Sequence, residues 1–102
     1  MELALRDRKA ATVAYAIQSY AALAAVAGRP ENAIVLLAAV RKLQQEAADR
    51  RIISPAGEHD FAIYMAMVRK QVDEATFNAR WAEGQAVTMD QAIEFALKER
   101  DT

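Results

Sequence analysis

The residues best suited to chemistry lie in one short segment, Glu58-His59-Asp60, which holds the single histidine of the 102-residue chain. Carboxylates and an imidazole are groups that bind metals or transfer protons. We predict that the segment lies in the first turn of a helix, where consecutive side chains point about 100° apart and cannot converge on one ion. We therefore expect an exposed His59, with Glu58 and Asp60 stabilised by the positive end of the helix dipole.

The rest of the composition indicates no other reactive site. The chain has no cysteine, which excludes disulfides and thiolate metal sites. It contains no Walker loop, no recognition helix and no kinase signature. The sequence therefore predicts a protein that is not an enzyme, with no catalytic residue, no cofactor and no metal site.

Charge and hydropathy restrict the possible partners. The 13 basic and 14 acidic residues give a net charge of -1, which offers no basic field for nucleic acid or anionic lipid. We interpret Arg6-Asp7-Arg8-Lys9 as the solvated end of a helix. No uncharged apolar run reaches the roughly 18 residues of a membrane span, and residues 1–6 lack the basic region and apolar core of a signal peptide. We expect a cytoplasmic protein with no direct nucleic-acid or membrane partner.

The turn Gly28-Arg29-Pro30-Glu31 separates two apolar segments with helical spacing. The spaced residues are Val13, Ile17, Tyr20 and Ala24 before the turn, and Ala33, Leu37, Val40 and Ala47 after it. Gly28 can adopt the left-handed conformation that ends a helix, and Pro30 suits the first turn of the next one. The sequence predicts helices over 3–27 and 30–49 that pack as an αα-hairpin, with alanines allowing close approach.

Three further helices are predicted by N-terminal capping patterns. The patterns are Ser54 with Pro55 for a helix over about 55–72, Asp73 for a helix over about 74–84 that ends at Gly84, and a capping box of Thr88 and Gln91 for the last helix. Their apolar faces comprise Phe61, Tyr64, Met65, Val68 and Val72 in the first, and Ala92, Ile93, Ala96 and Leu97 in the last. We expect Trp81, four residues after Phe77, to be buried and to anchor the last two helices to the helix over 55–72.

These elements indicate one all-α domain over residues 1–102 with a single core. A helical hairpin over 1–50 is followed by C-terminal capping helices over 54–102.

The hairpin is similar to one tetratricopeptide repeat, a helical unit of about 34 residues. The matching residues are Ile17, Tyr20, Ala21 and Ala24 in the first helix, Gly28 in the turn, and Ala33, Leu37 and Val40 in the second helix. Residues 77–93, FNARWAEGQAVTMDQAI, resemble the closing segment of large bacterial ATPase transcriptional regulators. There, an F-x-x-x-W-A-E-G-R-A-L-[ST]-L-E-[EQ]-A pattern ends a tetratricopeptide array, and many members carry a LuxR-type DNA-binding domain. Gln85, Val87 and Met89 depart from that pattern.

The resemblance implies a fragment of a right-handed α-solenoid that acts as a non-catalytic protein–protein interaction or scaffolding module. Its partner would be another protein or the upstream domains of a regulator. Tyr15, Ala22 and Val26 form a second apolar stripe on the first helix, which would face the preceding repeat in a full-length regulator. In a chain that starts with this helix, we expect the stripe to join two copies as a homodimer. The alternative is a small-ligand-binding or enzymatic domain that uses an apolar groove between helices.

Overall fold

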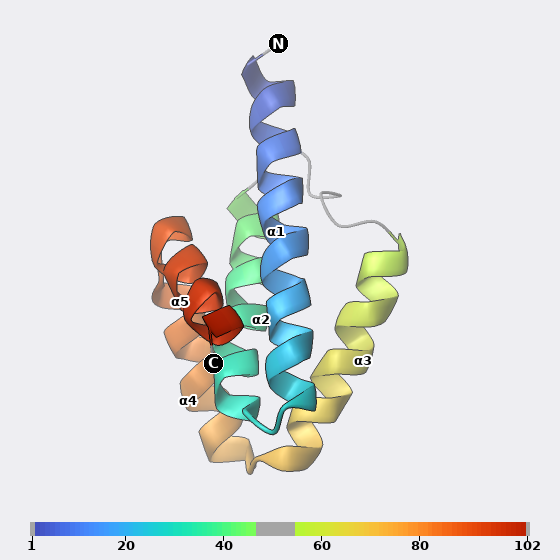
Figure 1. The fold of residues 1–102 in the computed structure, drawn as a ribbon, viewed down its shortest axis with the longest axis vertical. Coiled ribbons are helices and arrows are strands. Elements are labelled where there is room, and N and C mark those ends of the chain that lie inside the picture. Colours follow the sequence, from blue (N-terminus) through green and yellow to red (C-terminus); the bar gives the residue numbers. More distant parts are fainter. Residues whose placement is uncertain (1, 47–54, 102) are drawn as a thin grey trace.

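The computed structural model describes the backbone of residues 2–46 and 55–101, and the side chains of residues 12–46 and 56–98. The described chain forms five helices and no strand, which confirms the all-α class (Figure 1). The helices are α1 (Glu2–Val26), α2 (Pro30–Glu46), α3 (Pro55–Gln71), α4 (Glu74–Ala86) and α5 (Met89–Asp101). Ala47, the predicted end of the second helix at Asp49 and the predicted Ser54 cap lie outside the described residues, as do the side chains of the Arg6–Lys9 segment.

The turn between α1 and α2 has the predicted glycine-dependent geometry. Gly28 has a φ of 81°, which is in the left-handed region. The N–H of Arg29 donates to the carbonyl of Ala24 at 2.8 Å, and the N–H of Gly28 donates to that of Ala25 at 3.4 Å. This pair of bonds is the Schellman motif, which satisfies the last carbonyls of a helix. Pro30 then begins α2, because its missing N–H costs no bond there.

Helix α2 lies at the centre of the molecule. Its residues from 33 to 40 are all buried, and the other four helices pack around it. A helix that is apolar on every side requires such an enclosed position. The polar residues Arg41 and Lys42 follow directly, so α2 is again partly solvated in its last turns, as it is at Glu31 in its first turn.

Helix α1 lies between α5 and α3 on one face of the molecule (Figure 1). Its predicted core positions Ile17 and Ala24 are 1% and 0% exposed. Helix α5 packs against α1 and α2 through Ala92 and Ala96, so the last helix returns to the first.

Helix α4 packs chiefly against α2, which changes the expected role of Trp81. Trp81 is only partly buried and stacks on Phe77, with ring centroids 5.8 Å apart and planes at 15°. Phe77 is buried, and the guanidinium of Arg69 in α3 lies 4.2 Å from its ring centroid. Phe77 therefore connects α4 to α3, and the predicted packing of Trp81 against Phe77 is present with Trp81 only partly buried.

The prediction that Gly84 ends the fourth helix is wrong. Helix α4 continues to Ala86, and Gly84 is buried within it. A Cβ atom at this position would lie 2.5 Å from the Cβ of Ala38 and would overlap the carbonyl oxygen of Val35. Glycine is required here because α4 lies unusually close to the backbone of α2.

The two described N-terminal caps agree with the sequence. The side chain of Asp73 accepts a 2.7 Å hydrogen bond from the N–H of Thr76. The N–H of Gln91 donates to the hydroxyl of Thr88 at 3.1 Å, and the N–H of Thr88 donates to the side-chain carbonyl of Gln91 at 2.9 Å. The second pair is the reciprocal capping box that was predicted.

Candidate interaction surface

The three interaction residues predicted from the sequence lie on one side of α1. Tyr15 is 74% exposed, Val26 is 73% exposed, and Ala22 between them is partly buried. Spacings of seven and four residues place these side chains on the same helical face. Leu23, which the sequence analysis missed, is 48% exposed beside them. We call Tyr15, Ser19, Ala22, Leu23 and Val26 the outer face of α1.

The outer face of α1 is apolar because the uncharged segment of this helix has more apolar side chains than its contacts with the other helices bury. The chain has no charged residue from position 10 to position 28. The opposite side of this segment packs into the core through Ala14, Ala21 and Ala25. The side chains of Tyr15, Leu23 and Val26 are therefore left exposed, on a helix that lies between α3 and α5 (Figure 1). Even Ser19 has its hydroxyl satisfied locally, since it donates to the carbonyl of Tyr15 at 3.0 Å.

A groove of about 260 Å³ borders the outer face along the contact between α1 and α5. Its lining includes Ala16 and Tyr20 of α1, and Ile93 and Leu97 of α5. Leu97 was predicted to continue the core face of the last helix, but it is 39% exposed at the edge of this groove. The groove can hold an apolar group and places no charged side chain against it.

A second hollow of about 280 Å³ lies between α2 and the start of α5. Its basic residue is Lys42, whose Nζ donates to the carbonyl of Val87 at 2.7 Å and lies 3.9 Å from Glu46. Val87 is the C-cap of α4, so Lys42 satisfies a carbonyl at the negative end of that helix. The lysine is therefore engaged in closing a helix end.

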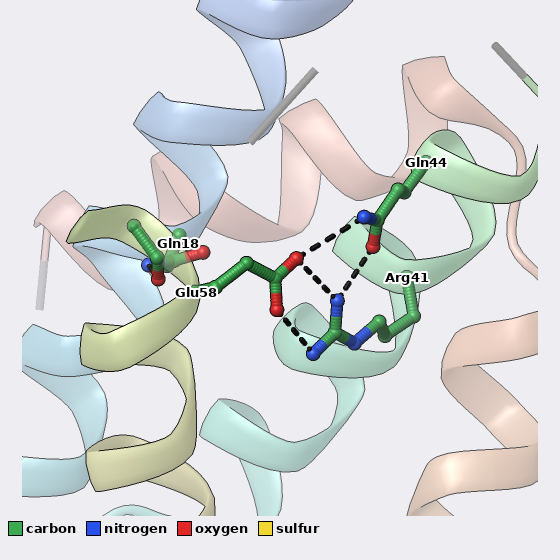
Figure 2. A network of polar contacts seen from close by, with 5 residues as sticks. Gln18, Arg41, Gln44 and Glu58 are labelled. Carbon is green, nitrogen blue, oxygen red and sulfur yellow. Dashed lines mark hydrogen bonds and ion pairs between the residues drawn. The ribbon is translucent and has the colours of Figure 1, made fainter. Parts of the chain in front are cut away.

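Glu58, the first residue of the segment Glu58-His59-Asp60, is bound to side chains of α2 (Figure 2). The two guanidinium nitrogens of Arg41 donate to the two carboxylate oxygens of Glu58 at 2.8 and 2.9 Å. Gln44 donates to the same carboxylate at 3.1 Å and accepts a further bond from Arg41. Glu58 lies in the first turn of α3 as predicted, and the pair that it forms with Arg41 across the helix contact was not predicted.

The hydrogen bond from Arg41 lowers the pKa of the Glu58 carboxyl below its ordinary value. Partial burial raises the pKa, but the positive charge of Arg41 and the hydrogen bond from Gln44 add to the lowering. Glu58 is therefore ionised near neutral pH, with its carboxylate occupied by two side chains. The guanidinium of Arg41 also lies 3.9 Å from the centroid of the Phe61 ring. Together these contacts join α2 to α3.

The remaining residues of the predicted chemical segment do not join this cluster. His59 and Asp60 are exposed. Among the side chains of residues 12–46 and 56–98, the structure brings no group of three His, Cys, Asp or Glu residues into a metal-binding arrangement. Gln18, the single buried polar side chain of the described region, donates to the carbonyl of Gly57 at 2.9 Å and further fixes α3 to α1.

No helix in the described part of the chain is both long and apolar enough to cross a membrane. No family model, no curated protein and no solved structure matches this chain. The outer face of α1 with its bordering groove is therefore the feature on which a function can be based.

Proposed function

We propose that this chain is a non-catalytic protein–protein interaction module that forms a homodimer through the outer face of α1. The observation that carries the proposal is the exposure of Tyr15 (74%) and Val26 (73%) on a segment without any charged residue. Large exposed apolar patches on a folded protein are typical of interaction sites. A second copy supplies an equally uncharged surface, so no charge has to be buried without a partner.

The size of the surface is sufficient for a modest dimer interface. Side chains exposed to this degree, with their neighbours, present apolar area on the order of 500 Å² per copy. Two such faces bury on the order of 1,000 Å² in total, the lower limit for a specific interface. At about 25 cal/mol per Å², complete burial sets an upper bound of roughly 25 kcal/mol on the hydrophobic contribution, from which the association cost of about 4–15 kcal/mol and the cost of ordering side chains are subtracted.

The resemblance to tetratricopeptide regions of bacterial ATPase and LuxR-type regulators supports the same class of function. Those regions bind other proteins or neighbouring domains and carry no catalytic motif. In this proposal residues 1–50 are a tetratricopeptide-like hairpin, and residues 54–102 are the helices that cap it. The return of α5 onto α1 and α2 is compatible with a capping role. The engaged carboxylate of Glu58 supports the non-catalytic assignment.

The alternative, a site for a small molecule, rests on the groove between α1 and α5. Its volume of about 260 Å³ is below the range of about 300–1,000 Å³ that is usual for ligand pockets. Such sites also direct a few polar groups at the ligand, whereas this lining is mainly aliphatic. We therefore favour a protein side chain as the occupant.

Light scattering after size exclusion at micromolar concentration tests the proposal. We expect the unaltered chain to be a dimer, and Tyr15→Glu and Val26→Glu to be monomers, because each buries two unpaired carboxylates at the two-fold contact. Met89→Glu is the matched control, since Met89 is 39% exposed at the start of α5 and outside the outer face. A monomer for the unaltered chain, with no change in either α1 variant, would contradict the proposal.

A further inference from the structure

We infer that the two copies pack their α1 helices antiparallel, with Tyr15 of each against Val26 of the second copy and Leu23 of each in the α1–α5 groove of the other. This inference rests on the proposed homodimer and adds its register and its contacts.

Four residues of the outer face, Tyr15, Ser19, Ala22 and Val26, have together with Thr12 the spacing of a helix–helix seam. Thr12, Tyr15, Ser19, Ala22 and Val26 follow one another at intervals of three, four, three and four residues. This is the heptad spacing by which two helices pack along a shared line. Thr12, Tyr15, Ser19 and Val26 are exposed, and Ala22 is partly buried. None of the five described helices buries the exposed residues of this line.

Two-fold symmetry and side-chain size select one register. A two-fold axis that lies in the contact plane and is perpendicular to α1 turns the two outer faces toward each other and makes the paired helices antiparallel. Setting Tyr15 against Val26 of the second copy also sets Ser19 against Ala22. The small residues then meet at the centre, where the backbones approach most closely, and the large residues meet on either side.

Neighbouring registers place charge on the seam. A shift by one heptad in one direction sets Val26 opposite position 8, within the charged segment Arg6-Asp7-Arg8-Lys9. A shift in the other direction sets Ser19 opposite Arg29. Pairing Tyr15 with Val26 keeps the facing positions from Tyr15 to Val26 free of charge, and it sets Arg29 opposite Thr12 at the end of the seam instead of inside it.

The same register fills the groove. Ala16 and Leu23 are seven residues apart and therefore lie on the same side of the seam. Because Ala16 lines the groove between α1 and α5, this is the α5 side. Flanking positions on the same side of a seam meet across an antiparallel pair, so Leu23 of the second copy lies over Ala16. The groove of about 260 Å³ offers Ile93 and Leu97 as further apolar contacts for that leucine. The exposed Leu23 and Leu97 are thereby covered in one contact.

Disulfide cross-linking tests the register directly, since the chain has no cysteine of its own. We expect a mixture of the Tyr15→Cys and Val26→Cys proteins to form a covalent heterodimer under mild oxidation. Neither protein alone should cross-link, because positions 15 and 26 are about 16 Å apart along a helix axis. A mixture of Tyr15→Cys and Met89→Cys is the control and should remain unlinked.

A separate substitution tests the contact of Leu23 with the groove. Ala16→Trp fills the groove from within the same chain and should raise the dimer dissociation constant at least about tenfold. Ala66→Trp, on an exposed position of α3, should leave it unchanged.

Failure of the register and failure of the dimer give different results. If the unaltered chain is a dimer but Tyr15→Cys cross-links to itself, or Ala16→Trp dimerises as well as Ala66→Trp, the inferred contact is wrong and the proposed function stands. If the unaltered chain remains a monomer throughout, both are wrong.

Discussion

Gly84 is the residue that sets how closely α4 approaches α2. The position is buried inside α4, and the space that a Cβ would need is taken by the backbone of Val35 and the side chain of Ala38. A backbone carbonyl in a central helix cannot move aside as the end of a flexible side chain can. The contact between the two helices therefore depends on the absence of one methyl group.

We expect Gly84→Ala to lower the free energy of unfolding by roughly 1–3 kcal/mol through overpacking, although alanine favours a helix by about 1 kcal/mol. Urea unfolding followed by circular dichroism measures the change. Gly28→Asn is the matched control, because a Cβ at Gly28 meets no atom within 4 Å and asparagine tolerates the left-handed conformation. An alanine variant as stable as the unaltered protein would show that α2 and α4 lie further apart.

The two glycines also show what local sequence can predict about single residues. Gly28 was assigned correctly because Pro30 follows it and apolar periodicity resumes at once. Gly84 was assigned as a helix end, because nothing in its neighbourhood distinguishes a terminating glycine from one that allows close approach. The distinguishing atoms belong to α2, far away in the sequence.

At the scale of elements, α3 is held to the hairpin by polar contacts at both ends. Arg41 and Gln44 bind Glu58 in its first turn, and Gln18 binds the carbonyl of Gly57. At the other end, Gln71 donates to the carbonyl of Ala25 at 3.4 Å. Phe61 and Val68 fill the core between these ends. The stability of this helix contact should therefore depend on the charge of Glu58.

The lowered pKa of Glu58 sets the direction of the pH dependence. A carboxyl whose pKa is lower in the folded state stabilises the protein above its ordinary pKa of 4.5, and that stabilisation is lost as the pH falls through the lower folded-state pKa. We expect Glu58→Gln to be less stable by about 0.5–1 kcal/mol at pH 7, given the solvent screening of this partly exposed pair. The difference should shrink progressively below pH 4.5.

Urea unfolding of both proteins across this pH range measures the difference. The hydrogen bonds from Thr76 also lower the pKa of Asp73, which gives both proteins a further pH dependence of stability. The difference between the two proteins removes this shared contribution. Asp60→Asn, which removes the same charge from an exposed neighbour, is the control. A deficit of Glu58→Gln that is as large at pH 3 as at pH 7 would contradict an ionic origin.

The first residues of α4 and α5 were predictable because their capping signals are local. Asp73, and Thr88 with Gln91, cap the helices that they were predicted to cap, since a cap and its partner lie within one turn. The pair of Arg41 and Glu58 was not predictable in this way. Each residue lies on a polar helix side that is typical of solvated surface, and only the packing of α3 on α2 brings them together.

At the scale of the whole molecule, the helices enclose α2 and leave one side of α1 uncovered (Figure 1). The first helix was predicted to carry a second apolar stripe that packs against a partner. The structure covers one side of this helix through α2, α3 and α5, and it leaves the outer face, with Tyr15 and Val26, exposed. The sequence identified this stripe because heptad spacing is visible locally. It did not identify the groove beside it, because the groove requires α5 to return to α1.

The most direct test of the dimer through the outer face is an isotope-filtered nuclear Overhauser measurement on a mixture of labelled and unlabelled protein. Tyr15 and Val26 are about 16 Å apart along one helix, too far for a transfer within a copy. We predict intermolecular transfers between the Tyr15 ring and the Val26 methyl groups at concentrations where light scattering shows a dimer. A Tyr15 ring that shows transfers only to neighbours in its own copy, in a protein that remains monomeric, would contradict the account.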